Sequence, residues 1–235
     1  MGTETPDEAQ VTMAGDIVWG ALASDTRETF ATLSKLPAPH DFYLAGGTAL
    51  ALQIGHRISH DLDFFSSTNA LGMEERGSLT RQLQRIESCT IRLESDGQLY
   101  ATIRGVEVSF LYQRHPLLFP AIEIESILVA QPVDIGLMKL SAIKDRGTRR
   151  DFVDLYCMRH VAPFKTLFQL LPRKYSDRPD FTVHLAYALC YFDDAENDPR
   201  ELRLLQKVNW AAVKKYCVEG ARLLSKMNIG LEPPK

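Results

Sequence analysis

Two aspartates separated by one residue are the side chains in this sequence best suited to chemistry. Asp61 and Asp63 stand in a stretch that alternates acidic and apolar residues, which predicts a β-strand. Alternate residues of a strand project from the same face, so the two carboxylates would lie about 7 Å apart along it. Carboxylate oxygens of this kind bind Mg²⁺ or Mn²⁺. The pair therefore predicts a divalent metal site.

A glycine pair upstream could hold phosphates beside that metal. Gly46 and Gly47 lie between an expected buried strand, residues 42–45, and an expected helix that begins at Thr48. Glycines let backbone N–H groups approach a phosphate closely, and the positive end of the helix points at it. A glycine pair by itself is a weak signal for a phosphate site, and two acids by themselves are explained by a solvated strand face. A glycine pair followed by two acids on an otherwise apolar strand favours a nucleotide site.

A basic and acidic cluster later in the chain could serve the same ligand. Lys139 and Arg146 are seven residues apart in an expected helix and so share a face. Asp151 and Asp154 follow at a spacing of three in a second helix, which Thr148 can cap. Such residues suit phosphate binding. A structural network of ion pairs between two packed helices would explain them as well, above all Asp154.

The elements that must position these residues change in kind along the chain. Strands are expected over residues 61–65, 90–94, 99–104, 106–112 and 127–130. Helices are expected over residues 48–53, 79–86 and 11–36, the last with a break near residues 23–25. After Pro132 only helices are expected, over residues 134–146, 149–159, 164–171, 181–192 and 210–227. This order predicts an α+β fold followed by a helical C-terminal half. We place the boundary at residue 131, which gives an N-terminal α/β domain (1–131) and a helical domain (132–235) that closes the cleft.

Composition excludes several classes of protein. The 235 residues are 45% hydrophobic and 24% charged, which allows a full core and excludes a disordered chain. Four scattered cysteines argue against a disulfide framework, the longest apolar run is too short for a bilayer, and the first ten residues are acidic and polar. We therefore expect a cytoplasmic protein with no membrane partner.

Charge is unevenly distributed between the two halves. Residues 1–134 hold 9 Lys and Arg against 18 Asp and Glu, whereas residues 135–235 hold 18 against 12. The basic second half could face an anionic ligand, although two solvated helical faces explain the excess equally well.

Several stretches together resemble a known family. They are Phe42 to Leu52; Gly55-His56-Arg57 with Ser59 and Asp61-Leu62-Asp63; Met138-Lys139-Leu140 with Arg150-Asp151 and Asp154-Leu155-Tyr156; and Asp193-Asp194 with Trp210 and Lys214. In these motifs the chain resembles the AbiEii/AbiGii toxin family of nucleotidyltransferases, which belongs to the DNA polymerase β-like superfamily. The resemblance spans residues 42–220, nearly the whole chain.

The resemblance implies a nucleotidyltransferase-like mixed sheet and a toxin of a toxin–antitoxin or phage-defence system. Such a toxin transfers a nucleoside monophosphate from an NTP to an acceptor hydroxyl, with Mg²⁺ or Mn²⁺. It implies tRNA or another RNA as acceptor and a cognate antitoxin protein as partner. The implied nucleotide-binding residues are Gly46, Gly47, Thr48, Arg57 and Lys139. The implied catalytic residues are Asp61, Asp63, Lys139 and Asp151, of which Asp61 and Asp63 hold the metal.

One departure from the superfamily pattern leaves alternatives open. A third carboxylate is common on a later strand, and Ser109 stands at that place, with Glu107 two residues earlier on the same face. Serine is a poor base at neutral pH, so a catalytically degenerate nucleotide-binding member is one alternative. A small-molecule nucleotidyltransferase of the antibiotic-modifying kind is another. A glycosyltransferase, which also uses Asp-x-Asp, fits the glycine pair less well.

Overall fold

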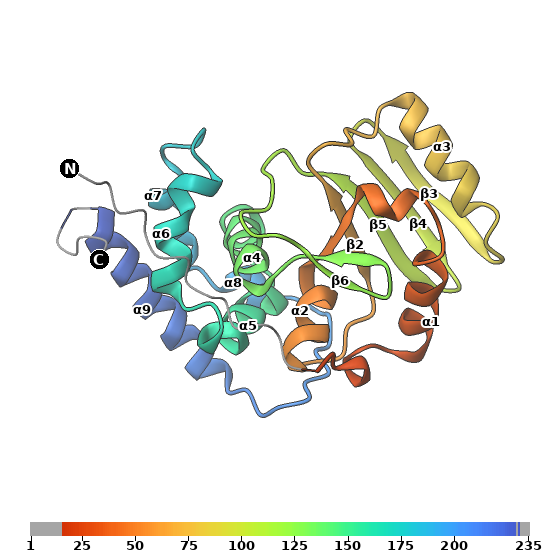
Figure 1. Ribbon diagram of the computed structural model, residues 1–235. Helices are drawn as coiled ribbons and strands as arrows, with labels where there is room; N and C mark the ends of the chain where they lie inside the picture. The colour runs from red at the N-terminus through yellow and green to blue at the C-terminus, as the bar shows by residue number, and fades with distance from the viewer. Residues whose placement is uncertain (1–15, 229, 231–235) are drawn as a thin grey trace.

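The sheet at the centre of the fold mixes parallel and antiparallel strands. The computed structural model describes residues 16–228 and 230 (Figure 1). Within them, seven strands form one sheet in the order β3-β4-β5-β2-β1-β7-β6. Their bounds are β1 (Tyr43–Ala45), β2 (Leu62–Ser66), β3 (Cys89–Ser95), β4 (Gln98–Ile103), β5 (Val106–Tyr112), β6 (Ile122–Ile124) and β7 (Ile127–Val129). The pairs β1–β7 and β2–β5 are parallel, and the others are antiparallel.

Helices flank the sheet and make up the later part of the described chain. They are α1 (Ser24–Leu33), α2 (Gly46–Ile54), α3 (Met73–Leu83), α4 (Pro132–Arg146), α5 (Arg149–Cys157), α6 (Phe164–Lys174), α7 (Phe181–Ala188), α8 (Asp193–Glu196) and α9 (Trp210–Asn228). In Figure 1 the strands, α1 and α3 stand on one side of α2, and helices α4 to α9 gather on the other. None of the helices in the described residues is long and apolar enough to cross a membrane. The expected α+β fold with C-terminal helices is confirmed.

The central strands have one fully buried face. Along β2, Leu62 and Phe64 are buried, whereas Asp63 and Phe65 on the opposite face are partly exposed. The ring of Phe64 stacks on that of Phe110 in β5, with centroids 5.0 Å apart. A one-residue slip of β2 would carry Asp63 into this core, so the buried face fixes the register of the strand. The same register holds Asp63 on the open face.

Helix α2 joins the sheet to the helical part of the molecule. Six consecutive residues of it, Thr48 to Gln53, are buried, because β1 and β2 cover one side and α4 and α5 cover the other. Buried side chains from both parts, among them Leu52 and Leu137, belong to one continuous hydrophobic core. The division into domains at residue 131 stays a prediction.

Some boundaries differ from those expected from the sequence. The described part of the helix expected over residues 11–36 is a short 3₁₀ turn followed by α1, and residues 11–15 lie outside the described residues. The helix expected over residues 181–192 ends at Ala188, and α8 is a separate short helix. Strand β6 was not expected. Its hairpin turns at Glu125 and Ser126, which take positive φ angles of 47° and 66° without the glycine or asparagine that usually marks such a turn.

Candidate active site

One pocket collects all the residues that the sequence singled out for binding and catalysis. It lies where the N-terminus of α2, the start of β2 and the facing ends of α4 and α5 meet. Its lining includes Gly46, Gly47, Thr48, Arg57, Asp61, Asp63, Lys139 and Asp151. The rest of its polar lining comes from Ser59, Arg146, Thr148, Arg150 and Arg200. Two carboxylates thus face several cations and a helix N-terminus.

Asp63 is held in place by its strand neighbours. It pairs with Ser109 across β5, and the Ser109 hydroxyl donates a hydrogen bond of 2.6 Å to Asp63 Oδ1. Burial raises the pKa of Asp63 above its usual range and Asp61 adds to the rise, while the Ser109 hydrogen bond and Lys139 oppose it. The folded chain therefore disfavours a negative charge at Asp63. A bound cation would remove that penalty.

The donor set fits a hard divalent cation only in part. Asp61 stands just before β2, and Arg150 Nη1 donates to its Oδ2 at 3.3 Å. Within residues 16–228, no group of three or more His, Cys, Asp or Glu side chains is arranged to hold a metal ion. Ser109 lies beside Asp63, and Glu107 is exposed on the same strand. The two carboxylates suit a Mg²⁺ ion that takes its other ligands from water and phosphate, as Mg²⁺ commonly does.

The two glycines are required for different reasons. Gly46 has a φ of +67°, and a Cβ there would lie 3.0 Å from Asp63 Oδ2. A Cβ on Gly47 would lie 1.8 Å from Arg57 Nη2, so the missing side chain makes room for the guanidinium. No side chain caps the N-terminus of α2. The first N–H groups of α2 therefore remain available to an anion in the pocket.

The side chain of Thr48 has a structural role in this pocket. Its hydroxyl donates to the backbone carbonyl of Asp61 and lies 2.7 Å from the hydroxyl of Ser59. The residue is 2% exposed. The side chain thus fixes the segment that leads into β2.

Asp154 is the centre of a buried ion-pair network. Its Oδ1 accepts from Arg57 Nε at 2.8 Å and lies 2.7 Å from His56 Nε2, and its Oδ2 lies 2.8 Å from Lys139 Nζ. Burial alone would raise the pKa of Asp154, but Lys139 and Arg57 beside it hold that pKa well below its usual range. The geometry is that of the structural network considered for this residue, and Asp154 is absent from the pocket lining.

Asp151 orients Lys139 and helps to cap the N-terminus of α5. Its Oδ1 accepts from Lys139 Nζ at 2.8 Å, and its Oδ2 accepts from the hydroxyl of Thr148 at 2.6 Å. The Thr148 N–H also reaches Oδ2, at 3.3 Å, in the manner of a capping box. Lys139 is therefore held by two carboxylates, and opposing effects leave its pKa raised: burial lowers it, but Asp151 and Asp154 outweigh the burial.

Sequence reasoning did not assign Arg200 to the site. It comes from an irregular segment between α8 and α9, where neither periodicity nor a motif marks it. The same segment is tied to the early chain by two backbone hydrogen bonds, from Ile58 N to Arg203 O at 2.8 Å and from Leu205 N to His56 O at 3.0 Å. Arg150 and Ser59 belong to the motifs that carry the family resemblance, but no binding role was expected for either from sequence.

This sheet, with its open carboxylate face and the helices around it, is the nucleotidyltransferase fold. A crystal structure from H. pylori, of a protein described as a nucleotidyltransferase, matches 90% of this chain and 99% of its own at a TM-score of 0.50 and 18% identity. At that identity the similarity shows the fold alone.

Sequence comparison then gives the family. The description "Nucleotidyl transferase AbiEii toxin, Type IV TA system" matches residues 29–227, so the chain belongs to the AbiEii family of nucleotidyltransferase toxins. The uncharacterized protein aq_aa25 of Aquifex aeolicus (strain VF5) is 34% identical over 184 residues, which cover 77% of this chain and 87% of that protein. The nucleotidyltransferase toxin MenT4 of Mycobacterium tuberculosis H37Rv is a weaker structural match, with 16% identity, 86% of each chain covered and a TM-score of 0.47.

Proposed function

We propose that this toxin transfers a nucleoside monophosphate from an NTP to an acceptor hydroxyl and releases pyrophosphate. Membership of a nucleotidyltransferase toxin family supports the class of reaction. The observation that carries the proposal is the pocket in which Asp61 and Asp63 face the turn at Gly46 and Gly47. An NTP needs a divalent cation and N–H donors for its phosphates, and this pocket offers sites for both.

Different residues of the pocket bind the triphosphate and the metal ion. The N–H groups at Gly46, Gly47 and Thr48 bind the triphosphate, and Arg150 neutralises part of its charge. Asp61 and Asp63 hold Mg²⁺, which supplies charge neutralisation at the reacting phosphate when bound. The acceptor oxygen forms a bond to the α-phosphorus, the bond from that phosphorus to the pyrophosphate oxygen breaks, and the hydroxyl proton passes to solvent.

Lys139 and Asp151 act by position. Lys139 Nζ lies 2.8 Å from carboxylate oxygens of both Asp151 and Asp154, so most of its charge is already compensated. An ammonium group has three N–H donors, so Lys139 can bind the phosphates only with a donor that these two carboxylates do not occupy. We therefore assign Lys139 to the nucleotide phosphates and Asp151 to the placement of Lys139.

The acceptor and the partner follow from the family. We propose tRNA or another RNA as acceptor, because the second half of the chain carries the excess of Lys and Arg that a phosphate backbone attracts. A type IV toxin–antitoxin family implies a cognate antitoxin protein. Since NTPs and tRNA are cytoplasmic, we place the reaction in the cytoplasm.

The test is incubation of the protein with each labelled NTP, Mg²⁺ and total tRNA. We expect covalent label on RNA, its loss in Asp61→Asn, and its retention in Glu107→Gln, which removes an exposed carboxylate from the same sheet. Label on an aminoglycoside and none on RNA would favour a small-molecule nucleotidyltransferase.

A second candidate function rests on Ser109. The hydroxyl beside Asp63 takes the place at which this superfamily commonly has a third carboxylate, and this favours a chain that binds nucleotide without turnover. Tight NTP binding with no label on any acceptor would support this candidate.

A further inference from the structure

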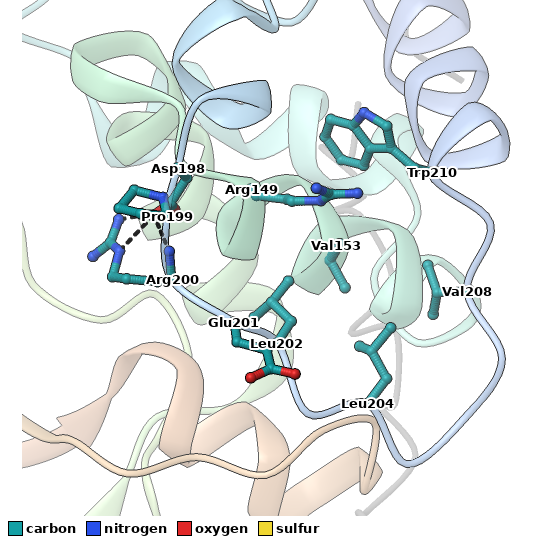
Figure 2. A pocket seen from close by; sticks show the side chains of 10 residues that line it. All are labelled: Arg149, Val153, Asp198, Pro199, Arg200, Glu201, Leu202, Leu204, Val208 and Trp210. Atoms are coloured by element: carbon teal, nitrogen blue, oxygen red, sulfur yellow. Dashed lines mark hydrogen bonds and ion pairs between the residues drawn. The ribbon is translucent and has the colours of Figure 1, made fainter.

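A second pocket opens beside the active site, between α5, residues 198–208 and the start of α9 (Figure 2). Arg200 lines both pockets. The first turn of α5 also connects them, because Arg150 reaches Asp61 in one pocket and Arg149 reaches Trp210 in the other. The two pockets therefore meet at Arg200 and at two adjacent arginines of α5.

The pocket has a flat aromatic wall. The ring of Trp210 is fixed by edge contacts with Phe152 and Phe192, at centroid distances of 6.2 and 6.1 Å, and its Nε1 donates to Glu196 at 3.4 Å. Over one face lies the Arg149 guanidinium, 4.9 Å from the ring centroid. The planar guanidinium and the ring behind it form a platform on which another planar group can stack.

The remaining walls combine apolar side chains with charges that are largely balanced. Val153, Leu202 and Leu204 line the pocket, and all three are at least partly buried. Arg200 is engaged by Asp198, with Nε–Oδ1 at 2.8 Å and Nη2–Oδ2 at 3.0 Å. A phosphate would gain little from an arginine already paired, and it would meet the carboxylates of Asp198 and Glu201 in the same lining. A planar ring with apolar faces and a polar edge fits these walls.

We propose that this pocket binds the nucleobase of the donor NTP, stacked on Arg149 and Trp210. The inference rests on the proposed function, which places the triphosphate at Gly46 and Gly47. Because Arg200 lines both pockets, the two are adjacent, and a nucleotide with its phosphates at Gly46 and Gly47 would place its base in the second pocket. Glu201 on the pocket wall adds a carboxylate that can accept N–H bonds from a base edge.

The test separates the base from the phosphates. Calorimetry with Mg²⁺ compares each NTP with inorganic tripolyphosphate, which has the charge but no base. In the parent we expect an NTP to bind more tightly than tripolyphosphate. Arg149→Gln should weaken NTP binding roughly tenfold, a loss typical of one stacked base, and leave tripolyphosphate binding unchanged. Arg159→Gln is the matched control, because it removes an arginine that lies 4.0 Å over the ring of Tyr156 and does not line the pocket.

A spectroscopic readout needs no change in the pocket. The chain has two tryptophans, so Trp19→Phe leaves Trp210 as the sole indole. We expect NTP to change its emission and tripolyphosphate to leave it unchanged.

Four results would overturn the inference. Equal NTP affinity in the parent and Arg149→Gln would show that no base stacks there. Equal losses for both ligands would make Arg149 a phosphate ligand. If Arg149→Gln weakened RNA binding and left NTP binding unchanged, the pocket would bind the acceptor RNA and not the donor base. A parent that binds neither NTP nor tripolyphosphate would refute the proposed function itself, and the inference with it.

Discussion

Replacing Ser109 by aspartate examines the two-carboxylate metal site directly. The Ser109 hydroxyl lies 2.6 Å from Asp63 Oδ1, and Ser109 is buried, so a new carboxylate would meet Asp63 at close range. Two like charges 4 Å apart repel by about 4 kcal/mol at an effective dielectric constant of 20, and the pair would relieve part of this by sharing a proton. We expect Ser109→Asp to lower the free energy of unfolding by roughly 1–3 kcal/mol in EDTA.

Mg²⁺ should reverse that loss. With a third carboxylate beside Asp61 and Asp63, the cation gains an anionic ligand and binds more tightly. A ligand at a hundred times its Kd stabilises the folded state by about 2.7 kcal/mol. We therefore expect Mg²⁺ to stabilise Ser109→Asp by more than it stabilises the parent.

Urea unfolding followed by circular dichroism, with EDTA and with Mg²⁺, measures both effects. Ser109→Asn is the control, because it has the shape of aspartate without the charge. Equal losses for the two variants in EDTA would mean that the effect is steric. If Mg²⁺ stabilises Ser109→Asp no more than the parent, Ser109 does not face the cation and the reasoning fails.

Three further predictions concern the walls of the site. Asp154→Asn removes the shared counter-charge of Arg57 and Lys139 and should cost about 3–5 kcal/mol in urea unfolding. The stabilisation by Asp154 is present above the usual aspartate pKa and is lost as pH falls through its lowered pKa, so a variant with an unchanged acid limb of its stability curve would contradict this. Asp63 has a raised pKa, so its contribution is largest at acid pH and is lost as pH rises through that pKa. Asp63→Asn should therefore stabilise the metal-free protein at neutral pH by about 1 kcal/mol and remove its response to Mg²⁺, which thermal melts with and without EDTA would reveal. Gly47→Ala places a Cβ 1.8 Å from Arg57 Nη2 and should cost about 2 kcal/mol. Combined with Arg57→Ala, the two losses should add to less than their sum, whereas strict additivity would show that the two residues do not compete for space.

The parts of the site that lie close together in sequence were predictable. Alternation predicts Asp61 and Asp63 on one side of a strand, and the glycine pair predicts a turn before a helix, because strand period and turn chemistry are local properties. The structure has a strand and a helix at these places but corrects their bounds: α2 already begins at Gly46, so the glycines form its first turn, and β2 begins at Leu62, so Asp61 stands just before the strand. The packing of Arg57 into the space at Gly47 was not predictable, because it depends on Asp154, about a hundred residues away in the chain.

Other parts depended on contacts that no local pattern records. Arg200 enters the pocket from irregular chain, which has no period to read. The hydroxyl of Thr48 serves the backbone of Asp61, and the sequence alone suggested a ligand for it. Residue spacing alone could not decide whether Asp154 belongs to a buried ion-pair network or acts as a catalytic acid, because both use the same residue types.

The backbone hydrogen bonds between residues 56–58 and residues 203–205 have a consequence for the order in which the protein is made. A ribosome synthesises the two glycines and the two carboxylates first, and Arg200 and the segment that pairs with His56 and Ile58 follow more than 130 residues later. A nascent chain that stops before residue 203 has the carboxylates without the wall that closes beside them. The pocket would therefore be complete only after residues 200–205 have been synthesised and have paired with residues 56–58.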